Sequence, residues 1–219
     1  MKKTVVFTFL FFAACAAFAQ SGTITEISGS VEIKAGGAAG FVPAKMGDSI
    51  DKNTVISTGF RSTALINLGS ANILVRPLTR LSLDELVRVQ NVETINVNLQ
   101  AGRVRVDVKP PAGSKADFTI KTPTATASVR GTDFDFDTRS IHVNEGAVAY
   151  SGDMGPAVLV MENNDSSVND ISGRVADPIE VYTTTILPPP PPGSGAPRGP
   201  ITELPLQDPD VGIGIRWDN

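Results

Sequence analysis

The sequence predicts an all-β domain, and three observations support this prediction. From Gly22 to about Leu187, apolar and polar residues alternate with a period of two, and the helical period of 3.6 is absent. Glycines and small polar residues separate the alternating runs, which limits each run to the length of a short strand. After Leu187 the composition changes to a proline-rich tail. An irregular β-solenoid-like stack and a β-sandwich of short strands both produce this alternation, so both architectures stay open.

The predicted strands follow one another along the whole domain. Val31 and Ile33 alternate with charged residues, and the glycine-rich stretch 35–40 that follows is not succeeded by a helix, so we interpret it as a hairpin tip. In each later run the apolar set should face the core and the polar set should face water. These core-facing sets are Leu81 and Leu83 with Val87 and Val89 (Leu86 being out of phase), then Ile95, Val97 and Leu99, then Val104, Val106 and Val108.

Four glycines, Gly29, Gly102, Gly146 and Gly173, each stand just before a predicted strand. Glycine adopts a positive φ there without steric cost, so these residues should make tight turns. The glycines are 73, 44 and 27 residues apart, which shows no fixed repeat period and argues against a strict solenoid array.

Residues 1–19 have the features of a signal peptide: a positively charged start, an apolar stretch and the small-x-small pattern of Ala17–Ala19. We therefore expect export to the periplasm or the exterior and cleavage before Gln20. A retained transmembrane anchor is the alternative, but the apolar run is short for a span of about 20 residues. In a second alternative, cleavage before Cys15 at a loose lipobox would leave a lipoprotein; for a cleaved chain, only this route predicts membrane attachment.

The β-domain should occupy residues 20–187, and a different kind of chain should follow over 188–219. Nine of the chain's prolines fall in 188–209, and Pro188–Pro192 is an unbroken run that favours a stiff polyproline II spacer of about 15 Å. At the end of the tail, Ile213, Ile215 and Trp217 alternate with other residues. This strand-like segment would pair with its own domain, fray, or add a strand to a partner protein.

The composition excludes several classes of function. The chain has 19 Lys+Arg, 23 Asp+Glu, one His and one Cys. Removal of the leader, with Lys2, Lys3 and Cys15, leaves 17 basic and 23 acidic residues and a net charge near −6. The mature chain then has no thiol nucleophile, no disulfide and no zinc site of the Cys or multi-His kind. An acidic chain with two Tyr and one Trp is also poorly suited to nucleic acid.

The remaining polar residues do not suggest an active site. Asp133, Asp135 and Asp137 share one strand face, but neighbouring carboxylates about 6.5–7 Å apart are too distant to hold calcium unaided. We expect a solvated acidic face. His142 should point away from the core, and no Gly-x-Ser-x-Gly nucleophile motif is present. We therefore expect no enzyme, no metal site and no cofactor.

The segment 115–150 is the most specific part of the sequence. Ala125, Ala127 and Val129 share one face of a strand, and Phe134 and Phe136 are the natural core residues of the next. Core positions thus change from odd to even numbers between these strands. Such a change needs a bulge or a tight bend, which we assign to Gly131, with Arg130 tying down carbonyls or a carboxylate beside it.

Several motifs in this order resemble the FecR family of extracytoplasmic domains. They cover about residues 22–150 and include Gly29-x-Val31, Gly47–Ile50, Thr58-Gly59, Ser62–Ser70, Leu99-x-Ala-Gly102-x-Val104, the specific stretch Thr122-Pro123 to Arg130-Gly131-Thr132-x-Phe134, and Val143-x-Glu145-Gly146-x-Val148. The resemblance implies a β-rich, solenoid-like fold in which Gly102, Pro123, Arg130, Gly131, Thr132, Phe134 and Gly146 are structural positions. This chain has Leu68-Gly69 where the family often has an Asp-Gly turn.

The best-known members of that family join this domain to a membrane segment and a cytoplasmic anti-sigma region. We expect neither part here, so the signalling role does not carry over. Our hypothesis is a non-catalytic exported module, monomer or weak dimer, for interaction with an envelope or outer-membrane protein or for envelope scaffolding. In the alternative hypothesis, the β-domain binds an envelope glycan or another ligand, and a weak hydrolase is the third option.

Overall fold

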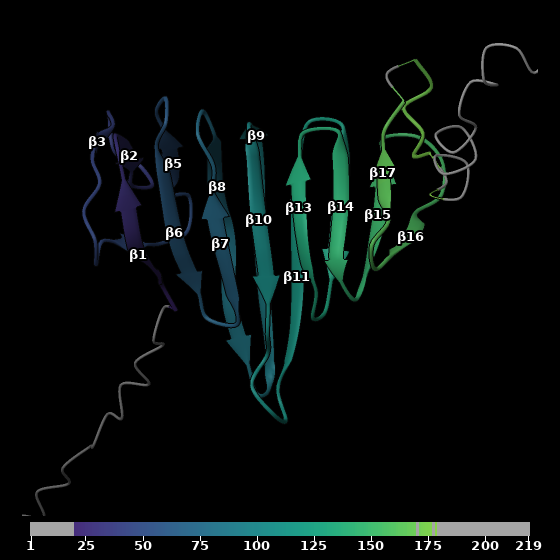
Figure 1. Ribbon diagram of the computed structural model, residues 1–219. Helices are drawn as coiled ribbons and strands as arrows, with labels where there is room; N and C mark the ends of the chain where they lie inside the picture. The colour runs from purple at the N-terminus through teal and green to yellow at the C-terminus, as the bar shows by residue number, and fades with distance from the viewer. Residues whose placement is uncertain (1–19, 170, 177, 179–219) are drawn as a thin grey trace, which may run out of the picture. The chain divides into compact units, whose positions relative to one another are not determined.

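The computed structural model describes residues 20–169, 171–176 and 178, and it contains two β-sheets that face each other (Figure 1). Neither sheet closes on itself, so the domain is an open, sandwich-like arrangement and not a closed solenoid. Among the described residues, no helix is long and apolar enough to span a membrane. The all-β prediction is confirmed, and of its two architectures the structure has the sandwich.

The first sheet, sheet A, has eight strands and is antiparallel throughout. Its strands, in spatial order, are β17 (Asp165–Ser167), β14 (Ser140–Glu145), β13 (Asp133–Asp137), β10 (Arg103–Val108), β7 (Ala71–Val75), β6 (Thr63–Leu68), β1 (Gly22–Ser28) and β4 (Ser49–Ile50).

The second sheet, sheet B, has nine strands, and its β9–β11 pair is parallel. Its strands, in spatial order, are β16 (Val158–Met161), β15 (Ala147–Gly152), β12 (Ala125–Val129), β11 (Lys115–Lys121), β9 (Val92–Ala101), β8 (Arg80–Val89), β5 (Val55–Thr58), β2 (Val31–Lys34) and β3 (Val42–Pro43). In both sheets the spatial order follows the chain order, apart from β3 and β4 at the N-terminal edge. The antiparallel β2–β3 pair confirms the predicted hairpin around 35–40.

The core lies between the two sheets and is built by the predicted alternation. Ile95, Val97 and Leu99 of sheet B and Val104, Val106 and Val108 of sheet A are all buried. Edge-to-face aromatic contacts join the sheets: Phe118 packs on Phe134, Phe134 on Phe136, and Phe136 on Tyr150, with ring centroids 6.0–6.4 Å apart. Such geometry stabilises aromatic pairs beyond the burial of their area.

The prediction for Val87 and Val89 was wrong. The pairing of β8 with β9 shifts register between Leu83 and Glu85, which is a β-bulge. The extra residue turns the rest of the strand over, so that Leu86 is buried while Val87 and Val89 point outward. The residue that seemed out of phase is therefore the one in the core.

Candidate interaction surface

The predicted turn glycines lie where the chain turns or passes from one sheet to the other. Gly29, Gly102, Gly146 and Gly173 all have positive φ, between 62° and 92°. The first three connect β1 to β2, β9 to β10 and β14 to β15, each a passage between the sheets. At Gly102, a Cβ atom would lie 2.5 Å from the Cα of Thr79, so the corner has no room for a side chain.

Gly131 lies between β12 of sheet B and β13 of sheet A, and the expected change from odd to even core positions occurs there. The mechanism differs from the prediction, since the φ of Gly131 is not in the left-handed region. The change arises because the chain leaves one sheet and enters the other, and a register shift between Asp133 and Phe134 accompanies it. Beside this corner Thr132 is buried, and its hydroxyl donates to the carbonyl of Ala147.

The sequence predicted that Arg130 would tie down backbone carbonyls or a carboxylate, and in the structure it pairs with a carboxylate. Its Nε donates to Asp117 at 3.1 Å, but 85% of the Arg130 side chain is exposed. An ion pair so open to water contributes little to stability, since solvent and salt screen it. Pro123 is likewise exposed, in the turn between β11 and β12.

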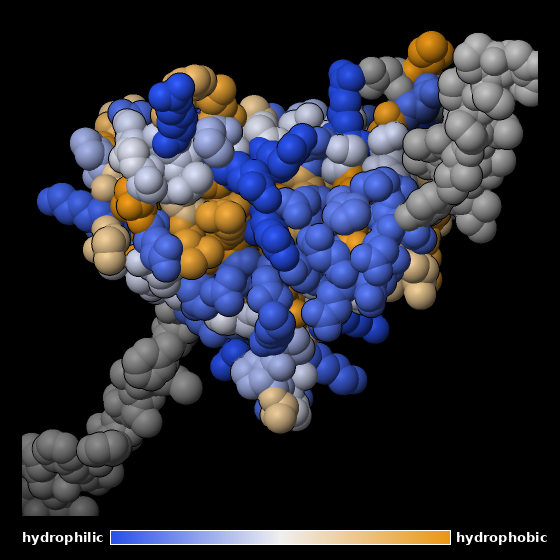
Figure 2. Space-filling model, viewed as in Figure 1, coloured by the Kyte–Doolittle hydropathy of each residue, from blue (hydrophilic) through white to orange (hydrophobic). Residues whose placement is uncertain are grey.

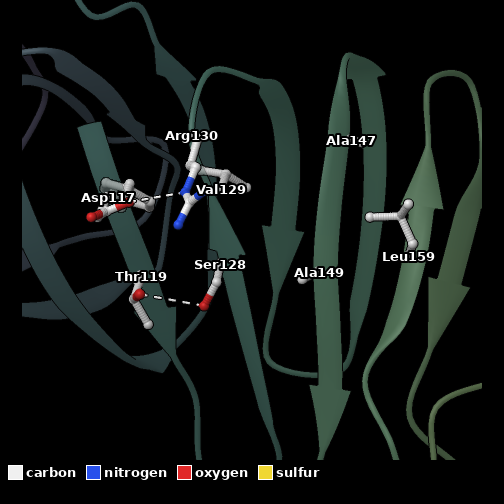
Figure 3. A pocket seen from close by; sticks show the side chains of 9 residues that line it. Asp117, Thr119, Ser128, Val129, Arg130, Ala147, Ala149 and Leu159 are labelled. Carbon is white, nitrogen blue, oxygen red and sulfur yellow. Dashed lines mark hydrogen bonds and ion pairs between the residues drawn. The ribbon is translucent and has the colours of Figure 1, made fainter. Parts of the chain in front are cut away.

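A hollow of about 490 Å³ lies on the outward face of sheet B beside Arg130 (Figure 3). Its floor is β15, whose outward residues Ala147 and Ala149 have the smallest side chains that a strand can present without glycine. On one side lie Arg130 and Ser128 of β12, and on the other Leu159 of β16. We call this feature the β15 groove.

The β15 groove opens toward an edge strand. β16 pairs with β15 on one side, and no strand among the described residues pairs with its other side. Leu159 and Met161 of β16 are 59% and 51% exposed. An apolar edge strand with free backbone groups is a template for a further strand, which natural domains usually protect with charges or proline. The four residues of β16 include neither.

The outward face of sheet A is charged, and its carboxylates are held by arginines. Arg105 makes a two-pronged contact with Asp133, at 3.0 and 2.6 Å, while Arg76 pairs with Asp135 and Arg103 with Asp137. Figure 2 shows the resulting hydrophilic surface over β13 and β14, beside a hydrophobic patch over β6 and β7 on the same side. The expected solvated acidic face is thus a ladder of half-buried cross-strand ion pairs.

The pKa values of two of these carboxyl groups are lowered. Partial burial alone would raise the pKa of Asp135, but hydrogen bonds from Arg76 and Asn144 outweigh it and lower that pKa. Burial likewise opposes the lowering at Asp137, where the donors are the backbone N–H groups of Arg139 and Ser140, the Ser140 hydroxyl and Arg103.

His142 points outward from β14, as predicted, and its Nδ1 lies 2.8 Å from a carboxylate oxygen of Asp165 on β17. Within the described part of the chain, no group of His, Cys, Asp and Glu residues is arranged to hold a metal ion. Residues 1–19, predicted as a signal peptide and including Cys15, and the tail residues Ile213, Ile215 and Trp217 lie outside the described residues.

Two features were missed at the level of sequence. The first is the β15 groove, because alanines and a leucine on separate strands carry no motif until those strands pair. The second is Glu93, which stands at the inward position two residues before Ile95 and is 1% exposed. Its carboxylate accepts the backbone N–H of Ser70 at 2.7 Å and contacts Gln20 and Arg88. The sequence did contain a signal for this residue, because Glu93 is a polar residue at the same alternating positions as the core residues Ile95, Val97 and Leu99.

Comparison with known proteins supports a family assignment for part of the chain. The FecR protein family matches residues 54–149, and no protein of curated function matches the chain. Two crystal structures of a protein from Parabacteroides distasonis, described as a putative anti-sigma factor, are similar at 16% identity with TM-scores of 0.46 and 0.45. The similarity covers 59% and 58% of this chain and 63% and 62% of those chains, so this chain spans less than two thirds of their length. Residues 54–149, from the start of β5 into β15, form a FecR-family domain.

Proposed function

We propose that this domain is a non-catalytic interaction module of the cell envelope. Its partner is a protein that contributes an extended segment, which adds to the outer edge of β16 and packs its outward side chains against Leu159 and Met161 at the margin of the β15 groove. The observation that carries the proposal is the combination of an apolar groove with an edge strand at its margin that no other strand of the described residues pairs with. In this mode of recognition, backbone hydrogen bonds supply affinity and the pockets for alternate side chains supply specificity.

The dimensions of the site fit a short peptide segment. β16 has four residues, so an added strand would pair over about 13 Å at the usual rise per residue. Within the groove, the facing hydroxyls of Thr119 and Ser128, 3.3 Å apart, and the exposed guanidinium of Arg130 offer polar contacts next to the alanine floor. A partner segment with alternating apolar side chains and one acidic residue would complement this surface.

Site-specific photocrosslinking in the native host tests this proposal. A benzophenone amino acid at Leu159 should give one discrete crosslinked partner, and the same probe at Val89 should not. Val89 is a matched control because it is exposed to a similar degree on a distant part of the same sheet. Ala149→Arg fills the groove at an exposed position and should abolish the Leu159 crosslink. Equal crosslinking at both probe positions, or a crosslink that survives Ala149→Arg, would contradict the proposal.

The envelope location is part of the same proposal, and the signal-like residues 1–19 support it. Intact mass and membrane partitioning of the mature protein test it separately. A chain that begins at Gln20 in the aqueous phase means a soluble exported module, whereas a lipid-modified start at Cys15 means a tethered lipoprotein. A mature protein that retains Met1 would refute export with cleavage.

A further inference from the structure

One end of the sandwich is built from six connections that lie next to one another. We define the corner rim as residues 28–30, 59–62, 76–80, 101–103, 122–124 and 138–139. Hydrogen bonds join successive connections: Gly59 donates to the carbonyl of Ser30, Leu78 to that of Gly59, and the hydroxyl of Thr79 to that of Arg103. These connections lie along the upper margin of the two sheets in Figure 1.

The corner rim carries charge of one sign. Its charged residues are five arginines, at positions 61, 76, 80, 103 and 139, and it contains neither Asp nor Glu, although the whole chain has a net charge of −4. Arg76 and Arg103 reach Asp135 and Asp137 on the flank of sheet A. The guanidinium of Arg61 lies 5.4 Å from the ring centroid of Phe60. Because Arg76 and Arg103 are paired with carboxylates, the positive charge of the rim rests on Arg61 and Arg80, which have no carboxylate partner among the described residues.

Two large apolar side chains project from the same rim. Phe60 is 72% exposed and Leu78 is 62% exposed, and the backbone N–H of Leu78 donates to the carbonyl next to Phe60. Figure 2 shows hydrophobic and strongly hydrophilic surface side by side along this upper margin. Exposed apolar side chains flanked by arginines are the arrangement with which proteins enter the interface of a lipid bilayer, whereas a peptide partner favours a groove.

The backbone holds these side chains in a costly conformation. Arg61 has φ 52° and Leu78 has φ 55°, in the left-handed region that suits glycine and asparagine. Of the five non-glycine residues with positive φ in the described chain, two others are asparagines, for which the conformation is ordinary. A leucine at such a position, with its side chain in water, contributes little to folding. Strain of this kind gathers at functional sites.

A hollow of about 690 Å³ lies beside Leu78, between this corner and the β13–β14 turn. Arg76, Arg103 and Arg139 line it together with the hydroxyl residues Thr138 and Ser140. Asp137 also borders the hollow, but its carboxylate already accepts hydrogen bonds from Ser140 and Arg103. The hydroxyl proton of Ser140 is donated to Asp137, but a guanidinium group has five N–H donors, so Arg76 and Arg103 keep donors for a phosphate beside their bonds to Asp135 and Asp137. The arginines of the hollow therefore suit a phosphate-bearing headgroup.

We propose that the corner rim docks on an anionic phospholipid surface. Phe60 and Leu78 enter the boundary between headgroups and acyl chains, and the rim arginines contact lipid phosphates. This surface is separate from the β15 groove: the rim is formed by connections at one end of the sandwich, and the groove is an apolar hollow on the outward face of sheet B. A domain docked in this way would keep β16 accessible to a protein partner, although the two proposals stand independently.

Cosedimentation of the mature full chain with vesicles tests the inference. Vesicles of phosphatidylcholine with about 30 mol % phosphatidylglycerol should bind the protein, and pure phosphatidylcholine should bind it weakly. Binding should fall as salt rises from about 0.05 to 0.5 M, because screening weakens the electrostatic part. Failure to bind the anionic vesicles at low salt would overturn the proposal and would favour an acidic protein as the occupant of the rim.

Matched variants locate the contact on the rim. Phe60→Ser should weaken binding at least tenfold, and Arg61→Gln should weaken it about fivefold, the usual effect of one basic residue near an anionic surface. Val89→Ser and Lys115→Gln change exposed residues away from the rim and should bind as the unmodified protein does. An equal loss in these controls would overturn the proposal.

Leu78→Asn separates docking from folding. Asparagine tolerates positive φ better than leucine, so this variant should unfold at the same or a higher temperature than the unmodified protein while binding the anionic vesicles more weakly. If Leu78→Asn binds the vesicles undiminished, the leucine has no role in docking and the inference fails. If it lowers the unfolding temperature clearly, the leucine is structural, which also refutes the inference.

Discussion

Replacement of Glu93 by alanine should destabilise the domain strongly, although Glu93 lies in no motif. Its carboxylate is buried and accepts the backbone N–H of Ser70, in the turn that joins β6 to β7. The same turn contains Gly69, where a Cβ atom would clash with the Glu93 carboxylate. In a region where the FecR resemblance leads one to expect an Asp-Gly turn, a carboxylate from another sheet therefore supplies the hydrogen-bond acceptor.

The magnitude follows from what alanine removes. The buried N–H of Ser70 loses its acceptor, which costs about 1–3 kcal/mol. One buried methylene group is also lost, at about 0.8 kcal/mol. Arg88, whose side chain is 43% exposed, regains water and adds little. The sum is roughly 2–4 kcal/mol, which for a domain of this size lowers the unfolding temperature by about 4–16 °C. Glu93→Gln keeps an acceptor of the same shape and should cost about 1 kcal/mol.

Thermal unfolding followed by circular dichroism at neutral pH measures this effect. Glu26→Ala is the matched control, because Glu26 is an exposed residue on β1 and its replacement should shift the midpoint by no more than about 2 °C. If Glu93→Ala unfolds within about 2 °C of the unmodified protein, the turn does not depend on this carboxylate. An ordering in which Glu93→Gln is as damaging as Glu93→Ala would refute the hydrogen-bond reasoning and point to charge alone.

Three further predictions follow from the geometry. Gly102→Ala should lower the unfolding midpoint by several degrees, because its Cβ atom would meet backbone atoms at a positive φ; Gly40→Ala, with nothing within 4 Å, is the control in the same melting assay. The lowered pKa values of Asp135 and Asp137 stabilise the fold above the unfolded-state pKa of about 4, and this contribution is lost as the pH falls through the folded-state pKa. In urea titrations at a series of acidic pH values, the free energy of unfolding of the double Asp→Asn variant should therefore fall less steeply with decreasing pH than that of the unmodified protein. An equal pH dependence of the two proteins would contradict the ion-pair ladder. Burial raises the pKa of Tyr150, so the contribution of its hydroxyl to stability is complete below about pH 10 and declines above it. Tyr150→Phe loses the hydrogen bond to the carbonyl of Arg139 and should lower the free energy of unfolding by about 1 kcal/mol at neutral pH and by less in alkali. A difference in free energy of unfolding that stays constant with pH would refute this assignment.

Much of the fold could be predicted from the sequence because the side-chain period of a strand is local information. The inward sets of β9 and β10, the core role of Phe134 and Phe136 and the turn glycines Gly102 and Gly146 all follow from alternation and backbone sterics. None of these predictions required knowledge of which strands are neighbours.

The rest depends on strand pairing, which the alternation does not encode. The arginines of β10 meet the carboxylates of β13 because these strands are adjacent in sheet A, although two strands of sheet B separate them along the chain. The bulge between Leu83 and Glu85 adds one residue to β8, so the inward and outward positions are exchanged in the second half of this strand. In the sequence, this exchange is visible only as an irregularity in the alternation. The β15 groove likewise exists only where Ala149 and Leu159 lie opposite each other.

The near agreement between chain order and spatial order in both sheets has a consequence for how the domain is made. When the chain is delivered from its N-terminus, each new strand meets an edge that earlier strands have already formed, so assembly can advance by accretion without waiting for the C-terminal residues. The same ordering means that strand pairs can be gained or lost during evolution at the end formed by β16 and β17, because no earlier connection has to change.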